Sequence, residues 1–254
     1  MVKYIRVKGE DNPVKILAFD TSNKTLTVSV MAENIVLGEI TTNVNKNHSV
    51  TLMPAIADLV AKVALTPQDI ERIVVAQGPG SYTGLRIGVT TAKTLADTLH
   101  CELVGVSSLA LIAANCRNYH GVIVPLFDAR RNNVYTGLYK WEQNELQNIK
   151  ADRHIGLEDL LVSLKHERDI LFVGEDVMKF SNQIKEVLPK ATLNEVPHWQ
   201  LPSGAVLAEL GAKKTPVSDI AAFLPLYLKR VEAEENWIAT QNDWTGDENY
   251  VEKI

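Results

Sequence analysis

Short apolar runs alternate with longer amphipathic segments along most of this chain. Apolar runs of about four to eight residues between turn residues predict buried strands, and apolar residues spaced three or four apart predict helices. Up to residue 106 the pattern predicts three strands, a helix, a strand, a helix and a strand, in that order. The strands are expected at 15–20, 25–31, 35–41, 73–76 and 102–106, and the helices at about 49–64 and 82–99, with a third beginning at Ser107 or Ser108.

The same order of elements returns in the second part of the chain. Strands are expected at 121–127, 133–141, 146–154, 170–173 and 191–196, and helices at 157–164, 179–188 and 203–213. The repeated order predicts an α/β protein with two mixed sheets, each flanked by helices. A duplicated order of this kind resembles the actin, sugar-kinase and Hsp70 (ASKHA) superfamily, in which each half has a ribonuclease H-like fold.

This repetition predicts two subdomains that divide near Gly105. The expected limits are 14–105 for the N-terminal subdomain, which holds both predicted contact helices, and 106–218 for the C-terminal one, with 219–237 packing back on the first. The polar, unpatterned residues 1–13 and the acidic residues 238–254 are expected to be flexible extensions.

Charge and composition exclude several classes of protein. The net charge of −5 is unsuited to a chain that grips nucleic acid alone, because phosphate neutralisation supplies much of that affinity. Cys101 and Cys116 have apolar neighbours and no CxxC spacing, so we expect buried free thiols. Without an apolar N-terminal segment or an apolar run of 18 residues, a cytoplasmic protein with no membrane contact is expected.

The glycine-rich run GPGSYTGLRIG at 78–88 is the most distinctive motif of the chain. It joins a predicted strand to a predicted helix, so backbone N–H groups near Gly80 and Ser81 could face an anion or a nucleotide. Its spacing, however, is neither that of a P-loop nor GxGxxG. Alternatively, Gly80, Gly84 and Gly88 lie four residues apart, on one helical face, where they would let a second backbone approach closely.

The helix at about 49–64 carries apolar residues on more than one face, and a single sheet cannot cover them all. This helix and the glycine-rich one are therefore expected to form a contact surface for a second protein. In the alternative, both helices pack only on their own sheet and the glycines ease that contact. The residues expected in the contact surface are His48, Leu52, Ile56, Gly84, Arg86, Gly88 and Leu95.

Two polar turns are candidates for nucleotide binding. At the end of the first strand, Asp20 could hold a metal-bound water while Thr21 and Ser22 bond phosphate, or the three could form an ordinary turn. In the second half, the turn at 128–133 has Ala129 and Arg130 where a phosphate-binding hairpin favours glycine. There the arginines could replace backbone donors, or the segment is a plain β-turn with exposed arginines.

Catalytic and metal-binding patterns are not found. None of the six histidines pairs with another at i, i+3 or i, i+4, the spacings that place two ligands on one helical face. We therefore predict no metal ligand, no catalytic residue and no hydrolase site.

Several segments together resemble the TsaB (YeaZ) family, from about residue 15 to residue 237. They are ILAFDTS at 16–22, NHS at 47–49, LMPAI at 52–56, the glycine-rich run, DARRNNVY at 128–135 and PLYLKR at 225–230. The resemblance implies a bacterial protein that helps to make N6-threonylcarbamoyladenosine at position 37 of tRNAs reading ANN codons.

In that family the protein is an inactive relative of the catalytic subunit TsaD. The resemblance implies a heterodimer with TsaD through the helices of the N-terminal half, a homodimer through the same surface in isolation, and binding of the ATPase TsaE. tRNA would be reached through the complex, no cofactor would be needed by the isolated chain, and ATP or ADP would enter with the complex. TsaD carries an HxxxH metal pair where Ser108 and Ile112 stand here, which supports a non-catalytic role.

Two enzymatic alternatives remain open at this point. One is an ATP-dependent small-molecule kinase of the same superfamily, with Asp20 positioning magnesium. Such a kinase would have to bind the adenosine of ATP with the segment Val173-Gly174-Glu175-Asp176. The two carboxylates of this segment would repel a polyphosphate. The other is a glycoprotease-like peptidase, for which the sequence contains no protease machinery.

Overall fold

The computed structural model describes residues 14–44 and 47–229. The strands are β1 (Lys15–Asp20), β2 (Leu26–Ala32), β3 (Ile35–Thr42), β4 (Arg72–Gly78), β5 (Glu102–Ser107), β6 (Val122–Asp128), β7 (Asn133–Glu142), β8 (Glu145–Gly156), β9 (Ile170–Val173) and β10 (Thr192–Leu193). The α-helices are α1 (His48–Lys62), α2 (Tyr82–Leu99), α3 (Ser108–Ala114), α4 (Leu157–Ser163), α5 (Ser181–Val187) and α6 (Gly204–Ala212).

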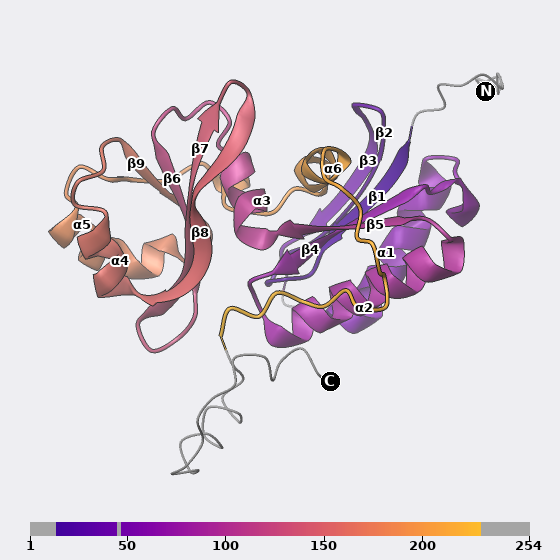
Figure 1. The fold of residues 1–254 in the computed structure, drawn as a ribbon, viewed down its shortest axis with the longest axis horizontal. Helices are drawn as coiled ribbons and strands as arrows, with labels where there is room; N and C mark the ends of the chain where they lie inside the picture. Colours follow the sequence, from indigo (N-terminus) through magenta and orange to yellow (C-terminus); the bar gives the residue numbers. More distant parts are fainter. Residues whose placement is uncertain (1–13, 45–46, 230–254) are drawn as a thin grey trace, which may run out of the picture.

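The strands form two five-stranded sheets with the same topology (Figure 1). The first has the order β3-β2-β1-β4-β5 and the second the order β8-β7-β6-β9-β10. In each sheet the first three strands along the chain pair antiparallel, and the fourth pairs parallel with the first. The predicted fold class, a duplicated actin-like α/β fold with two mixed sheets flanked by helices, is confirmed.

The predicted strands and helices are also confirmed, with ends that differ by a few residues. Polar side chains cap the first turn of three long helices: Ser81 accepts a hydrogen bond from a backbone N–H of α2, and Ser203 does so at α6. At α1 the capping residue is Asn47. The helix expected at 179–188 is divided into a 3-10 turn, Val177–Phe180, and α5.

Strand β2 explains why the first sheet needs helices on both of its faces. Its residues from Leu26 to Met31 are all buried, although the sequence alternates apolar and hydroxyl side chains. Helix α1 packs on the apolar side, and α6 covers the side of Thr27 and Ser29. The hydroxyls are paired there, for example Thr27 with Thr41 at 2.7 Å, so their burial leaves these groups bonded.

Helix α6 packs in the half opposite to the one in which the sequence analysis placed it, whereas α3 packs in the expected half. Helix α6, expected within 106–218, lies on the first sheet, where Leu207 and Ala208 pack with β1, β4 and β5. Helix α3 follows the first sheet along the chain, yet its Leu109 and Ile112 pack against the second. The two helices lie together between the sheets (Figure 1).

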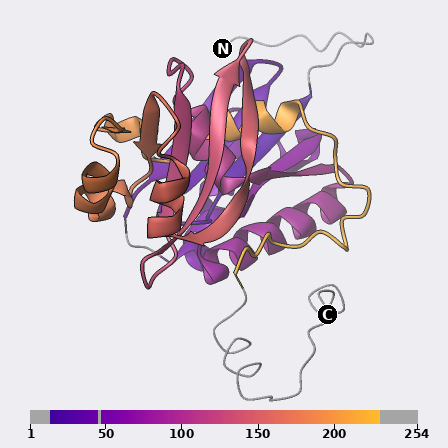
Figure 2. The same cartoon turned by 60° about the vertical axis from the view of Figure 1, so that its left-hand side comes forward.

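The chain then returns to the first half after α6. The segment of residues 217–227 runs beside β5 and α2, where Val217 N–H donates to Leu103 O at 2.8 Å and Leu226 N–H donates to Gln77 O at 2.8 Å. Phe223 enters the core of this half. Figure 2 shows this segment beneath the first sheet, with the long β7–β8 hairpin in front. The expected return at 219–237 extends beyond residue 229, and its last part, like 1–13 and 238–254, lies outside the described residues.

Within residues 14–44 and 47–229, no helix has both the length and the apolar composition needed to cross a membrane.

Candidate functional site

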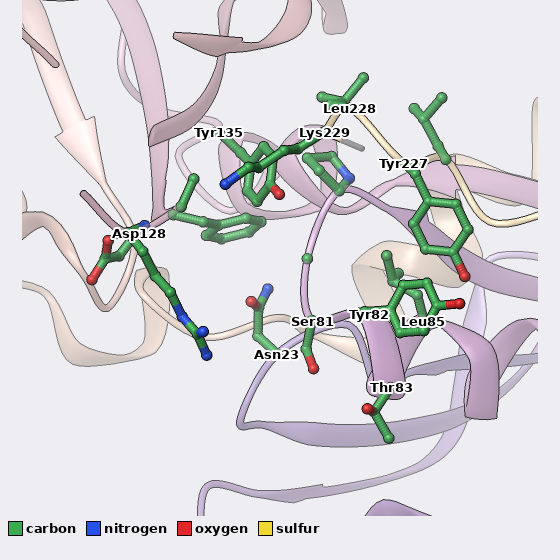
Figure 3. A pocket seen from close by; sticks show the side chains of 16 residues that line it. Asn23, Ser81, Tyr82, Thr83, Leu85, Asp128, Tyr135, Tyr227, Leu228 and Lys229 are labelled. Carbon is green, nitrogen blue, oxygen red and sulfur yellow. Dashed lines mark hydrogen bonds between the residues drawn. The ribbon is translucent and has the colours of Figure 1, made fainter. Parts of the chain in front are cut away.

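A cleft of about 480 Å³ lies where the two halves and the returning segment meet. The first half contributes Asn23 and the turn before α2, the second half contributes the β6–β7 turn and Tyr135, and the returning segment contributes Leu226–Lys229. Figure 3 shows Tyr82 and Tyr227 on one side, Asp128 on the other, and Asn23 and Ser81 between them. Side chains more than 200 residues apart in sequence therefore share one cavity.

The two tyrosines form one wall of the cleft. The ring centroids of Tyr82 and Tyr227 are 5.1 Å apart, and the rings are inclined by 30°. The guanidinium of Arg86 lies 5.4 Å from the centre of the Tyr82 ring and donates to its hydroxyl at 3.1 Å. Burial raises the pKa of Tyr227, so this phenol stays neutral and can serve as a flat, uncharged surface.

The β6–β7 turn forms the opposite wall and is held by an unusual backbone. Arg130, Arg131 and Asn132 all have positive φ angles, of 68°, 52° and 59°. The carboxylate of Asp128 accepts from Arg130 N–H at 2.8 Å and pairs with Lys179 Nζ at 3.3 Å. The turn thus places Arg130 in the lining of the cleft, and both interpretations that the sequence allowed stay open.

The polar turn expected to bind phosphate and a metal is buried within the first half. Asp20, Thr21 and Ser22 are at most 2% exposed. Asp20 Oδ1 accepts from Ser22 N–H at 2.6 Å, and Thr21 Oγ1 donates to Gly84 O at 2.7 Å. The polar groups of these three residues thus bond within the fold and do not line the cleft, which speaks against the predicted nucleotide contact. The kinase alternative, which needs Asp20 to position magnesium, gains no support from this placement.

Burial of Asp20 also changes its ionisation. Loss of hydration raises the pKa of this carboxyl from 3.8 to about 6, against the lowering effects of the hydrogen bonds from Ser22 and the charge of His48. Of the residues expected to bind a nucleotide, only Gly80 and Ser81 line the cleft. Ser81 N–H donates to Ser22 O at 2.6 Å, which fixes the turn against β1.

The glycines of α2 allow a close approach within the chain. A side chain at Gly84 would collide with the backbone oxygen of Thr21, and one at Gly88 would come within 2.5 Å of Thr21 Oγ1. Both glycines are buried. Both glycines thus face the turn after β1, which favours the alternative in which they ease packing of α2 on its own sheet. Their contact with a second protein stays a prediction.

The other residues predicted for the contact surface divide into two groups. Leu52 and Ile56 are 1% and 5% exposed and belong to the core of the first half, and Leu95 is half-buried against that core. His48 and Arg86 remain accessible, although His48 Nε2 bonds to Asn23 O at 2.8 Å. No sequence-based prediction selected the residues that α1 turns outward.

Those outward residues form a second apolar stripe on α1. They are Val50, Met53, Pro54, Ala57 and Ala61, and all are exposed. The spacing i, i+3, i+4, i+7 and i+11 places them on one helical face. Val50 is 65% exposed and Met53 is 46% exposed. The sequence indicated this stripe only through the apolar composition of α1 on more than one side. Which of these sides faces solvent depends on the packing of the helix in the folded chain.

The two cysteines and the residues at positions 108 and 112 are withdrawn from solvent to different degrees. Cys101 and Cys116 are free thiols, as predicted, but only Cys116 is fully buried, and burial raises its pKa to about 12. Ser108 and Ile112 are 1% and 2% exposed in α3. Within the part of the chain that the structure describes, no group of three or more His, Cys, Asp or Glu side chains could hold a metal ion.

Comparison with known proteins identifies relatives along almost the whole chain. Residues 35–237 match the family model of TsaD, the tRNA N6-adenosine threonylcarbamoyltransferase. The tRNA threonylcarbamoyladenosine biosynthesis protein TsaB of Bacillus subtilis is 44% identical over 227 residues, which are 89% of this chain and 99% of that protein. The Escherichia coli protein of the same name is 28% identical over 164 residues, covering 64% of this chain and 69% of the relative.

Among solved structures, YeaZ from Pseudomonas aeruginosa superposes with a TM-score of 0.72 at 24% identity, covering 85% of this chain and 100% of that one. This likeness shows a shared fold. The family model spans more than half of the chain, and the Bacillus subtilis relative matches over nearly its entire length. The chain therefore belongs to the family that the TsaD model describes and, within it, to the TsaB proteins of tRNA threonylcarbamoyladenosine biosynthesis.

Proposed function

We propose that this chain is the non-catalytic partner of a TsaD subunit in the formation of N6-threonylcarbamoyladenosine at position 37 of tRNAs that read ANN codons. The observation that carries the proposal is the 44% identity to TsaB of Bacillus subtilis over 99% of that protein. The buried serine and isoleucine at positions 108 and 112 support it, because neither has the imidazole group that an HxxxH metal pair requires.

The outward stripe of α1 is the surface that we assign to the TsaD subunit. A helix that is apolar on two sides must bury both to gain their full hydrophobic contribution, and the core of the first half covers only the side of Leu52 and Ile56. Val50 and Met53 are left to a partner. Exposed Arg86 on the neighbouring helix α2 supplies a polar rim beside the stripe.

The assignment is tested by Val50→Asp, which puts a charge into the proposed contact. Val50 is the third residue of α1, where a carboxylate suits the helix dipole, so the fold should be retained. We expect co-purification with the TsaD subunit of the same bacterium to fall by roughly tenfold or more, because an unpaired charge would be desolvated on binding.

The matched control is Val162→Asp on α4, another exposed helical valine, which is 58% exposed against 65% for Val50. It makes the same chemical change in the opposite half and should leave binding unchanged. If both variants bind the TsaD subunit like the unmodified chain, the stripe is not the contact. If the unmodified chain retains no TsaD subunit, the proposed function itself fails.

The remaining features of the proposed complex follow from the same family membership. They are a cytoplasmic location, a homodimer through the same stripe when TsaD is absent, recruitment of TsaE, and entry of ATP or ADP only with the assembled complex. Size-exclusion chromatography with light scattering tests the homodimer directly, since Val50→Asp should then shift the isolated chain toward the monomer.

A further inference from the structure

The cleft between the halves contains exposed aromatic rings. The proposed contact of α1 with a TsaD subunit gives these rings no role. Tyr82 and Tyr227 stack on each other yet remain 43% and 37% exposed. Tyr135 lines the same cavity from the second half (Figure 3). Exposed aromatic rings in a cavity are suited to a planar partner, and single nucleic-acid bases stack on such rings with little dependence on sequence.

Positive charge lines the same cavity. Arg130 and Lys229 both belong to its lining, and they come from the two different halves of the molecule. Arg130 is held there by a left-handed backbone that an arginine adopts only at a cost, fixed by the Asp128 carboxylate and by Asn133 N–H, which donates to Arg130 O at 3.0 Å. The nearby Asp128 carboxylate is offset by Lys179.

The volume of the cleft and the burial of the Asp20–Ser22 turn restrict which ligand the cleft can bind. A cavity of about 480 Å³ is near the lower end of the range for ligand sites and accommodates one nucleotide rather than a long polyphosphate chain. The residues that would position a metal-bound polyphosphate, Asp20–Ser22, are sealed in the first half. A single phosphate and a single base therefore fit the groups that do line the cavity.

We propose that this cleft binds one unpaired nucleotide of an RNA strand, with its base on the Tyr82–Tyr227 wall and its phosphate between Arg130 and Lys229. The inference rests on the proposed function, whose substrate is a tRNA. A net charge of −5 is unsuited to holding RNA with this chain alone, so in this proposal the cleft adds its contact to those of the assembled complex.

The test uses the complex with TsaD and a fluorescent anticodon stem–loop RNA. Tyr227→Ala should weaken binding roughly tenfold with an unchanged salt dependence, and Tyr227→Phe should retain the affinity because the ring remains. Arg130→Asn combined with Lys229→Gln should weaken binding and reduce the slope of log affinity against log salt by about 0.7, because one fewer phosphate is neutralised. Asparagine tolerates the left-handed backbone of residue 130, so the turn is kept.

The matched control is Lys165→Gln with Arg168→Gln, an equal removal of charge at exposed positions far along the second half. This pair should bind RNA like the unmodified complex. Equal weakening in both charge variants, or full affinity after Tyr227→Ala, would overturn the inference. So would tight binding of free AMP that leaves the RNA bound, since the cleft would then serve a small nucleotide. Each variant is first checked for TsaD binding, so failure of the complex is distinguished from failure of the cleft.

Discussion

At the scale of single residues, Asp20 shows how one side chain can have the chemistry of a site and serve the fold instead. Its carboxylate is an appropriate group for positioning a metal-bound water, and it lies at the end of β1, where the sequence suggested a ligand site. In the folded chain it accepts from Ser22 N–H and is 2% exposed. Residue type and position along the chain predict what a group could do, but burial decides whether a ligand reaches it.

The raised pKa of Asp20 predicts a specific dependence of stability on pH. The folded state holds this proton up to about pH 6, whereas the unfolded chain releases it near pH 3.8, so folding loses stability as the pH rises through this window. The shift corresponds to about 3 kcal/mol. Asp20→Asn has no charge to desolvate, so the difference in unfolding free energy between variant and unmodified chain should move in the variant's favour by most of that amount from pH 4 to pH 7.

Urea unfolding at several pH values measures this difference. A difference between the two proteins that stays constant across the window would show that the Asp20 carboxyl is hydrated in the folded protein, against the structure.

At the scale of elements, the packing of α6 on the first sheet differs from the placement expected from the sequence, whereas α3 packs in the half where it was expected. The sequence placed both helices correctly along the chain, but a periodic apolar pattern says only that a helix must be covered, not by which sheet. Helix α6 fits the first sheet because Gly204 and Gly211 leave room for Ser29 and Val74. These contacts are made across more than 130 residues of intervening chain.

The packing of α6 on the first sheet predicts which strands lose stability when a cavity is made in α6. Leu207 is completely buried against the first sheet, so Leu207→Ala should cost about 2–5 kcal/mol. Hydrogen exchange followed by mass spectrometry should show reduced protection in β1 and β4 more than in β6 and β9. Leu160→Ala in α4, an equally buried leucine of the second half, should give the opposite pattern. Equal reductions in both sheets for the two variants would contradict the placement of α6.

At the scale of the whole molecule, a partly buried polar cluster joins the two halves. Ser107, at the end of β5, donates to one oxygen of Asp152 on β8, and Tyr139 on β7 donates to the other. Ser107 also accepts from the first backbone N–H groups of α3, at 3.1 Å each. Burial raises the pKa of Asp152, while the two hydroxyls oppose the shift. The cluster thus fixes α3 and the long hairpin relative to the first sheet.

Removing the shared acceptor should therefore weaken the contact between the halves. Asp152→Ala leaves the hydroxyls of Ser107 and buried Tyr139 without this partner and should lower the unfolding free energy by about 1–3 kcal/mol. Tyr139→Phe removes one donor and leaves Asp152 bonded to Ser107, so its effect should be smaller. Differential scanning calorimetry compares the two, and a larger decrease for Tyr139→Phe would show that Asp152 is not the centre of the cluster.

The agreement between sequence and structure is greatest for features that depend on neighbouring residues. The alternation in β2, the cap at Ser81 and the repeated order of strands and helices are local, because side-chain direction follows a period of about two or 3.6 residues. The candidate site was predicted less well. Of the residues expected to bind a nucleotide, the structure brings only Gly80 and Ser81 to the cleft, and Tyr82 and Tyr227 received no role although both belong to motifs noted in the sequence.

The sequence by itself determined the duplicated α/β order, the family and the absence of paired histidines, since each can be read from residue type and spacing. Only the tertiary structure decided that Gly84 and Gly88 face Thr21, that α1 turns Val50 and Met53 outward, and that the two halves share a cleft lined by Tyr82, Arg130 and Lys229. The physical reason is that burial and close approach depend on which distant segments pack together.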